Sequence, residues 1–148
     1  VVIVDNIDSF FTHPGDFLII HDWKRPWRIT GNSSVYRFKL GAFPGLMPYF
    51  REHFDEIRQK FRNEQAYLSW YVDQEKKLSY WPDSWCKSYK YHCLQKIPLA
   101  YFKPPVKPEG AKIIVFHGEI NPPDAVNGGG GKWYRYVLPS DWIKEAWH

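Results

Sequence analysis

The chain has 148 residues and a mass of 17.7 kDa, with 44% hydrophobic and 24% charged residues. This length and balance predict one globular domain over residues 1–148, and they argue against a disordered chain or a multidomain assembly. Aromatic residues make up 19% of the chain, which is more than the packing of a core usually needs. No apolar run approaches the roughly 20 residues of a membrane-spanning helix.

The charge and cysteine content indicate which partners to expect. The formal net charge is +4 and the sequence pI is about 9.0, which fits either ordinary solubility charge or attraction of an anionic ligand such as a nucleotide diphosphate. Lys and Arg are scattered rather than arranged in a stripe, so nucleic acid is not an expected partner. Cys86 and Cys93 are too few for a disulfide framework and predict reduced, part-buried thiols. A cytoplasmic protein is therefore predicted, with the inner face of the membrane left open as its place of action.

Strands and helices alternate in the first half of the chain. Continuous or alternating apolar patterns predict strands at residues 1–4, 17–20 and 34–40. Residues 7–11 predict one helical turn. Apolar side chains recur at helical spacing over residues 45–61, and Asn63 is a suitable N-cap for a second helix.

The second half is predicted to be less regular. Residues 76–110 contain five prolines that block long helices, and residues 113–117 form the last clear strand. Residues 122–131, with two prolines and four glycines, predict a flexible loop, and Ser140 begins a short terminal helix. The alternation of strands and helices predicts an α/β fold with a mixed sheet.

Two predicted strands end in residues suited to binding. His117 stands at the carboxyl end of a buried strand, where ligands bind in open α/β sheets. It can bind a divalent metal, donate to a phosphate oxygen, or be a structural histidine bonded to backbone. Gly118 would let a ligand approach the backbone closely or would form a plain turn. Asp22 follows a second buried strand, where a charge is either solvated or functional.

Other polar and aromatic groups have both functional and structural explanations. Asn32 precedes two serines that suit hydroxyl recognition or a turn, and the Glu64 carboxylate is favoured by the helix dipole without any function. Lys90 lies beside aromatic residues and either holds a phosphate or is an exposed loop lysine. Tryptophans that serve as sugar platforms or as packing residues are Trp23, Trp27, Trp81, Trp85, Trp133, Trp142 and Trp147.

In order along the chain, these segments resemble bacterial nucleotide-sugar glycosyltransferases with a GT-A-type fold, of the glycogenin and lipopolysaccharide galactosyltransferase type. Residues 1–11 resemble the stretch that follows the DxD metal motif of that family. Residues 32–35, Asn-Ser-Ser-Val, match its NSGV or NAGV segment, and residues 64–65, Glu-Gln, match its DQ pair. Residues 115–122 match its FHGxxKP loop, and residues 85–90 resemble a block in uncharacterised bacterial members. The resemblance implies the C-terminal part of a glycosyltransferase catalytic domain.

The resemblance implies a metal-dependent transfer of a hexose from a nucleotide diphosphate sugar to a glycan or lipid-linked acceptor. His117 would be the third protein ligand of a Mn or Mg ion, beside the two DxD aspartates. Glu64 and Gln65 would lie beside the anomeric carbon and orient the donor sugar. Asp22 would hydrogen-bond that sugar, and Asn32 would line the donor or acceptor pocket.

The sequence departs from the family's pattern at positions that change these expectations. Asn121 replaces the lysine of the family's KP, so Lys90 or Lys132 would supply the phosphate contact. The chain begins just after the expected DxD pair, and we therefore expect it to bind metal poorly and to be inactive alone. The aromatic and basic loop at 22–31, with Trp27, is expected to contact the acceptor. The rival prediction is a non-catalytic carbohydrate-binding module with Trp platforms, a class that is typically all-β, and a purely structural role is a third possibility.

Overall fold

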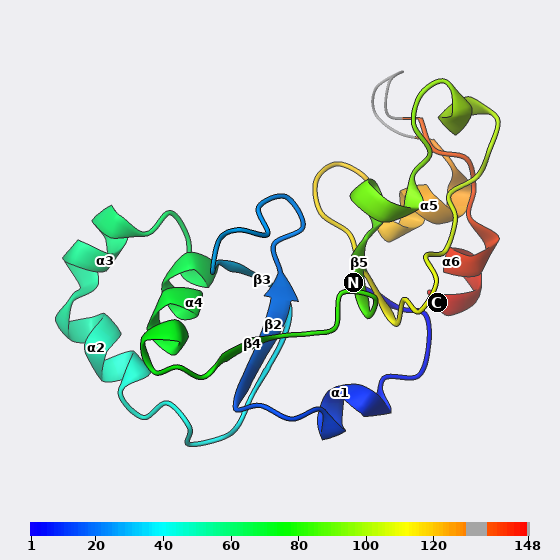
Figure 1. The fold of residues 1–148 in the computed structure, drawn as a ribbon. Helices are drawn as coiled ribbons and strands as arrows, with labels where there is room; N and C mark the ends of the chain where they lie inside the picture. The colour runs from blue at the N-terminus through cyan, green and yellow to red at the C-terminus, as the bar shows by residue number, and fades with distance from the viewer. Residues whose placement is uncertain (130–135, 148) are drawn as a thin grey trace. The chain divides into compact units, whose positions relative to one another are not determined.

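The computed structural model describes residues 1–129 and 136–147 (Figure 1). The chain divides into two compact units. Unit 1 comprises residues 1–12 and 84–148, and unit 2 comprises residues 13–83. Each unit is described by itself below, and the expectation of one domain over residues 1–148 stays a prediction.

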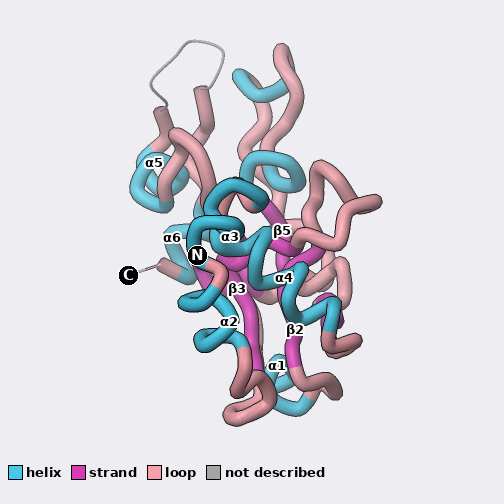
Figure 2. Tube along the Cα trace, turned by 90° about the vertical axis from the view of Figure 1, so that its left-hand side faces the viewer, coloured by secondary structure: helices cyan, strands magenta, loops and turns pink. Residues whose placement is uncertain are grey.

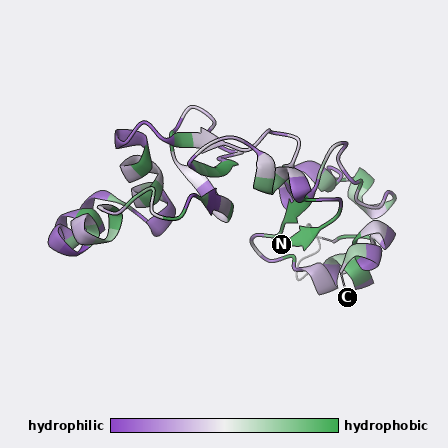
Figure 3. Cartoon of the chain, turned by 90° about the horizontal axis from the view of Figure 1, so that it is seen from below, coloured by the Kyte–Doolittle hydropathy of each residue, from purple (hydrophilic) through white to green (hydrophobic). Residues whose placement is uncertain are grey.

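Unit 1 is built on a three-stranded mixed sheet of order β1-β6-β5. The central strand β6 (Ile113–Val115) is antiparallel to β1 (Val2–Ile3) and parallel to β5 (Cys86–Ser88). All three residues of β6 are buried, as expected for the middle of a sheet, and Figure 3 shows strands beside the N-terminus in hydrophobic colours. The strands expected at 1–4 and 113–117 are thus confirmed, in shorter form.

Short helices complete unit 1. They are α1 (Asp8–Thr12), the π-helix η1 (Tyr89–Cys93), the 3-10 helix η2 (Leu99–Tyr101), α5 (Pro122–Asn127) and α6 (Asp141–Ala146). Tyr89, Ile114 and Ile143 are fully buried members of the core that these elements enclose. The expected turn near residues 7–11 and the terminal helix after Ser140 are confirmed.

The expected loop at 122–131 was wrong in its first half, because α5 occupies it. Pro122 and Pro123 stand at the start of α5, where the missing N–H of proline is not needed. Asn121 is the N-cap, and its backbone N–H donates to the Asp124 carboxylate at 2.8 Å. Gly128 ends the helix with a φ of 76°, so the described part of this segment is ordered by caps rather than left as a free loop.

Unit 2 also contains a three-stranded mixed sheet, of order β3-β2-β4. The central strand β2 (Phe17–His21) is antiparallel to β3 (Gly31–Phe38) and parallel to β4 (Leu78–Tyr80). The first four residues of β2 are buried, which confirms the expected strand at 17–20. The β3 strand begins and ends earlier than the expected residues 34 and 40, and its register against β2 shifts between Ile19 and Ile20.

Three helices belong to unit 2: α2 (Leu46–Glu52), α3 (Phe54–Lys60) and α4 (Glu64–Gln74), drawn as cyan tube in Figure 2. The single helix expected at 45–61 is thus divided at His53. The His53 ring stacks on Tyr49 with centroids 4.1 Å apart, and its Nδ1 lies 3.1 Å from the Tyr49 carbonyl oxygen. That carbonyl also accepts the His53 backbone N–H, and this shared acceptor marks the division. The Asn63 cap is confirmed, since its side chain accepts the Ala66 N–H at 3.2 Å.

Both sheets are mixed, so the expected α/β class with mixed sheets is confirmed. Within the described residues, no helix is long and apolar enough to cross a membrane. Cys86 and Cys93 are in no disulfide bond, and their thiols are buried rather than part-buried. Burial raises the pKa of each thiol to about 12, which makes both unreactive as nucleophiles at neutral pH.

Candidate functional site

Two polar residues meet at the carboxyl ends of the parallel strands β5 and β6. Ser88 is the last residue of β5 and pairs with Val115, two residues before His117. The parallel register therefore brings both side chains to the same edge of the sheet. Ser88 Oγ and His117 Nε2 are 2.7 Å apart, and the Ser88 side chain is fully buried. The expected position of His117 at a strand end is confirmed, and a serine hydroxyl is its partner.

Ser88 also begins the π-helix η1. Its Oγ accepts the Tyr91 N–H at 3.3 Å, and its own backbone N–H donates to His92 Nδ1 at 3.0 Å. Burial lowers the pKa of His92, and the charge of Lys87 lowers it further, which favours the neutral ring that this acceptor role requires. Single π-turns are rare and occur often at functional sites. The local backbone is therefore shaped around the hydroxyl that contacts His117.

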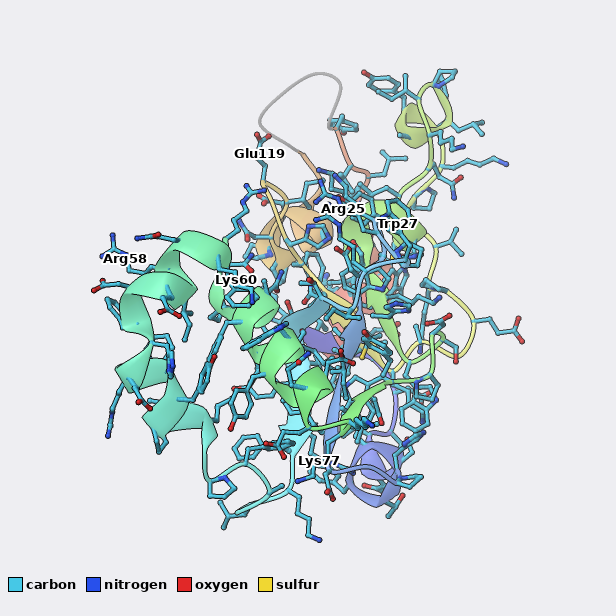
Figure 4. The ribbon with its side chains drawn as sticks, turned by 60° about the vertical axis from the view of Figure 1, so that its left-hand side comes forward. Arg25, Trp27, Arg58, Lys60, Lys77 and Glu119 are labelled. Atoms are coloured by element: carbon cyan, nitrogen blue, oxygen red, sulfur yellow. The ribbon has the colours of Figure 1, made fainter. Side chains whose placement is uncertain are left out.

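A cavity of about 520 Å³ lies against this cluster in unit 1. Basic, aromatic, acidic and apolar residues line it beside His117: Lys90, Lys96 and Lys103, Tyr89, Tyr91 and Tyr136, Glu119, and apolar residues that include Leu94, Ile97 and Ile120. The volume lies within the range of small-molecule sites. The three lysines outnumber the single carboxylate of Glu119, which Figure 4 labels, so positive charge exceeds negative charge in the lining. An anionic ligand that carries a ring system suits this lining.

The structure places the predicted binding residues of this region differently with respect to the cavity. Lys90 lines it, with its ammonium 5.7 Å from the centroid of the Tyr91 ring. Gly118 has a φ of 94°, and a Cβ built there would meet no atom within 4 Å. The backbone angle therefore explains this glycine better than a crowded approach does. Lys132 lies outside the described residues.

The metal ion that the resemblance implies has only one candidate ligand in the described chain. Within residues 1–129 and 136–147, no group of three or more His, Cys, Asp or Glu residues could hold a metal ion. His117 Nε2 is already within hydrogen-bond distance of Ser88, so a metal ion on that atom would displace the hydroxyl. Binding through the other ring nitrogen would instead leave Ser88 to orient the ring. The described residues do not compose a metal centre by themselves.

A second polar cluster forms in unit 2, where β3 meets the start of α4. Ser33 Oγ donates to Glu64 Oε1 at 2.8 Å, and the Ser33 N–H donates to Gln65 Oε1 at 3.2 Å. The register shift in β3 places Ser33 opposite the helix, as bulges often do. Asn32 has another role, because its Oδ1 accepts the Ser34 N–H at 2.9 Å. Ser33, the neighbour of the predicted Asn32, is therefore the residue that contacts the predicted pair Glu64 and Gln65.

The loop that follows β2 carries the remaining predicted contacts. Asp22 Oδ1 accepts the Lys24 N–H at 2.8 Å, a local turn that accounts for the aspartate without a ligand. Trp27 is 76% exposed and labelled with Arg25 on this loop in Figure 4. Trp81, by contrast, is buried in the packing of unit 2. Trp27 is the most exposed tryptophan among the described residues, which do not include Trp133.

The predicted site residues therefore form two groups. Glu64 and Gln65 belong to unit 2 with Asp22 and Asn32, whereas His117 belongs to unit 1 with Lys90 and Gly118. Reasoning from the sequence missed the roles of Ser88, His92 and Ser33. A signal for Ser88 was present, since it lies inside the 85–90 block that the resemblance singled out.

The chain was also compared with known proteins. It matches no family model, and no curated protein or solved structure shows a significant similarity to it. The family resemblance therefore stays a prediction.

Proposed function

We propose that the chain belongs to a glycosyltransferase that moves a hexose from a nucleotide diphosphate sugar to a glycan or lipid-linked acceptor. The cavity of unit 1 carries this proposal, because Lys90, Lys96 and Lys103 surround a space beside His117. The two mixed sheets are compatible with the α/β class, and the GT-A-like fold is part of the proposal.

The lining residues suggest how the chain would act on such a donor. Lysine ammonium groups would offset the negative charge that develops on the diphosphate leaving group. The rings of Tyr91 and Tyr136 offer faces on which a base can stack. His117 would donate to a phosphate oxygen while Ser88 fixes its orientation.

A further part of the proposal rests on the resemblance. A Mn or Mg ion would supply further charge neutralisation at the diphosphate. His117 is its candidate ligand in the described chain, and the roles proposed above for the chain's own residues need no metal ion.

Calorimetric titration of the chain with a panel of nucleoside diphosphates, with and without Mn, tests the proposal. We expect binding that weakens by about tenfold in Lys96→Gln/Lys103→Gln, since each lost charge–phosphate contact costs about 1 kcal/mol or less at an exposed site. His117→Ala should weaken it as well. Lys144→Gln removes an exposed lysine of the same unit outside the cavity and should leave binding unchanged. A folded chain that binds no nucleoside diphosphate would overturn the proposal.

The exposure of Trp27 supports the rival, a carbohydrate-binding module. An exposed indole can stack on a sugar ring, and Trp27 lies on a loop rather than in the core. Oligosaccharide binding that disappears in Trp27→Ala, in a chain that ignores nucleotides, would favour this rival. The helices of both units weigh against it, because such modules are typically all-β.

A further inference from the structure

One segment of unit 1 presents apolar side chains to solvent between lysines. We call residues 94–107 the arm. In Figures 1 and 2 the arm extends away from the rest of its unit and carries the short helix η2 at its tip. Its exposed apolar residues are Ile97, Leu99, Tyr101, Phe102 and Val106. Phe102 is 78% exposed, and exposed apolar residues grouped on one segment are a mark of an interaction surface.

Hydrogen bonds hold the shape of the arm at its base and at its tip. The Val106 N–H donates to the Cys93 carbonyl at 3.0 Å, and Trp142 Nε1 donates to the Pro105 carbonyl at 3.0 Å. Around η2, the N–H groups of Phe102 and Lys103 both donate to the Leu99 carbonyl, at 3.0 and 2.9 Å. Leu99 and Phe102 are therefore displayed on a closed turn rather than on an unstructured loop.

The charge of the arm identifies the kind of surface that it fits. Residues 84–108 contain five lysines and no aspartate or glutamate. Lys96 and Lys103 flank the apolar residues, and within the described residues neither forms an ion pair. Apolar and aromatic side chains bordered by lysines are the pattern of a segment that inserts into the headgroup region of an anionic bilayer.

We propose that the arm docks the chain on an anionic lipid bilayer, with Leu99 and Phe102 inserted and Lys96 and Lys103 facing the phosphate groups. Lys96 and Lys103 also line the cavity, whereas Leu99 and Phe102 do not. The bilayer would therefore lie beside the cavity mouth. This selects a lipid-linked acceptor over a soluble glycan, a consequence that rests on the proposed function.

Flotation with vesicles of equal parts phosphatidylglycerol and phosphatidylcholine, against vesicles of phosphatidylcholine alone, tests the docking. The chain should float with the anionic vesicles and be released by salt. Leu99→Ser/Phe102→Ser should weaken binding by roughly tenfold or more, because two inserted side chains are lost. Leu40→Ser, which changes a 91% exposed leucine of unit 2, is the matched control and should bind as the unchanged chain does.

The outcomes separate this inference from the proposed function. Leu99→Ser/Phe102→Ser should still bind nucleoside diphosphates, and His117→Ala should still float with anionic vesicles. Absence of flotation, equal binding to neutral vesicles, or full binding by Leu99→Ser/Phe102→Ser would overturn the docking even if nucleotides bind. A dimer in sedimentation that Leu99→Ser/Phe102→Ser dissociates, without flotation, would assign the arm to a second copy of the chain and also overturn it.

Discussion

Replacing Ser88 by alanine removes the hydroxyl that joins β5, the π-helix η1 and His117. Ser88 Oγ lies 2.7 Å from His117 Nε2 and accepts the Tyr91 N–H at 3.3 Å. Each such hydrogen bond contributes about 1 kcal/mol net, and groups left buried without a partner add to the loss. Because Ser88 is fully buried, water cannot replace the hydroxyl without rearrangement. We expect Ser88→Ala to lower the free energy of unfolding by about 2 kcal/mol.

Three measurements locate this effect. Urea unfolding followed by circular dichroism gives the free energy, and amide hydrogen exchange should show the loss in β5 and β6. The 15N shifts of the His117 ring report the Nε2 contact directly and should change in Ser88→Ala. Ser84→Ala, at an exposed serine of the same unit, should stay within about 0.5 kcal/mol of the unchanged chain. A Ser88→Ala chain with equal stability and an unshifted His117 ring would refute the reasoning.

Three further changes test the structure. Gly31→Ala should cost about 2 kcal/mol in urea unfolding, because the new Cβ would lie 2.5 Å from a methyl of the buried Ile19; an unchanged unfolding midpoint would contradict this packing. Asn63→Ala should cost about 1 kcal/mol and reduce the helix signal, since the cap of α4 is lost; a gain in stability would contradict it. Burial, and then Lys87, lower the pKa of His92 below its ordinary 6.5, so the unfolded chain binds protons first as pH falls. Stability should therefore decline below about pH 6.5, and less steeply in His92→Asn, which retains an acceptor; parallel pH profiles would exclude His92 as the cause.

The patterns that predicted this fold correctly were those set by local chemistry. The apolar run at 17–20 became the buried strand β2, and Asn63 caps α4 as its side chain suggests. Boundaries that depend on side-chain contacts were missed. The division at His53 follows from a ring that meets the Tyr49 carbonyl, which apolar spacing does not encode. Pro122 begins a helix only because a cap and a capping carboxylate surround it.

At the candidate site, a contact between residues far apart in the sequence was missed in the same way. His117 was predicted because an apolar strand ends beside it, which is a local signal. Its partner Ser88 lies 29 residues earlier, and the two meet only because β5 and β6 pair in parallel with Ser88 opposite Val115. Strand β5 is three residues long and gives no periodic pattern of its own, so its pairing could not be predicted from the sequence.

The parallel pairing of β5 and β6 also connects the two proposals. After β5 the chain turns through η1 and continues into the arm, so one short segment supplies Ser88, the cavity lysines and the exposed Phe102. The arm returns to the unit at Val106, which donates to the carbonyl of Cys93 at the end of η1. A ligand that orders the cavity wall would therefore also order the arm, and a bilayer that holds the arm would hold that wall. Because both proposals use Lys96 and Lys103, nucleotide binding and vesicle binding should change each other's affinity by the same factor, as reciprocal coupling requires. Nucleoside diphosphate affinities that are identical with and without anionic vesicles would show that the arm and the cavity act independently.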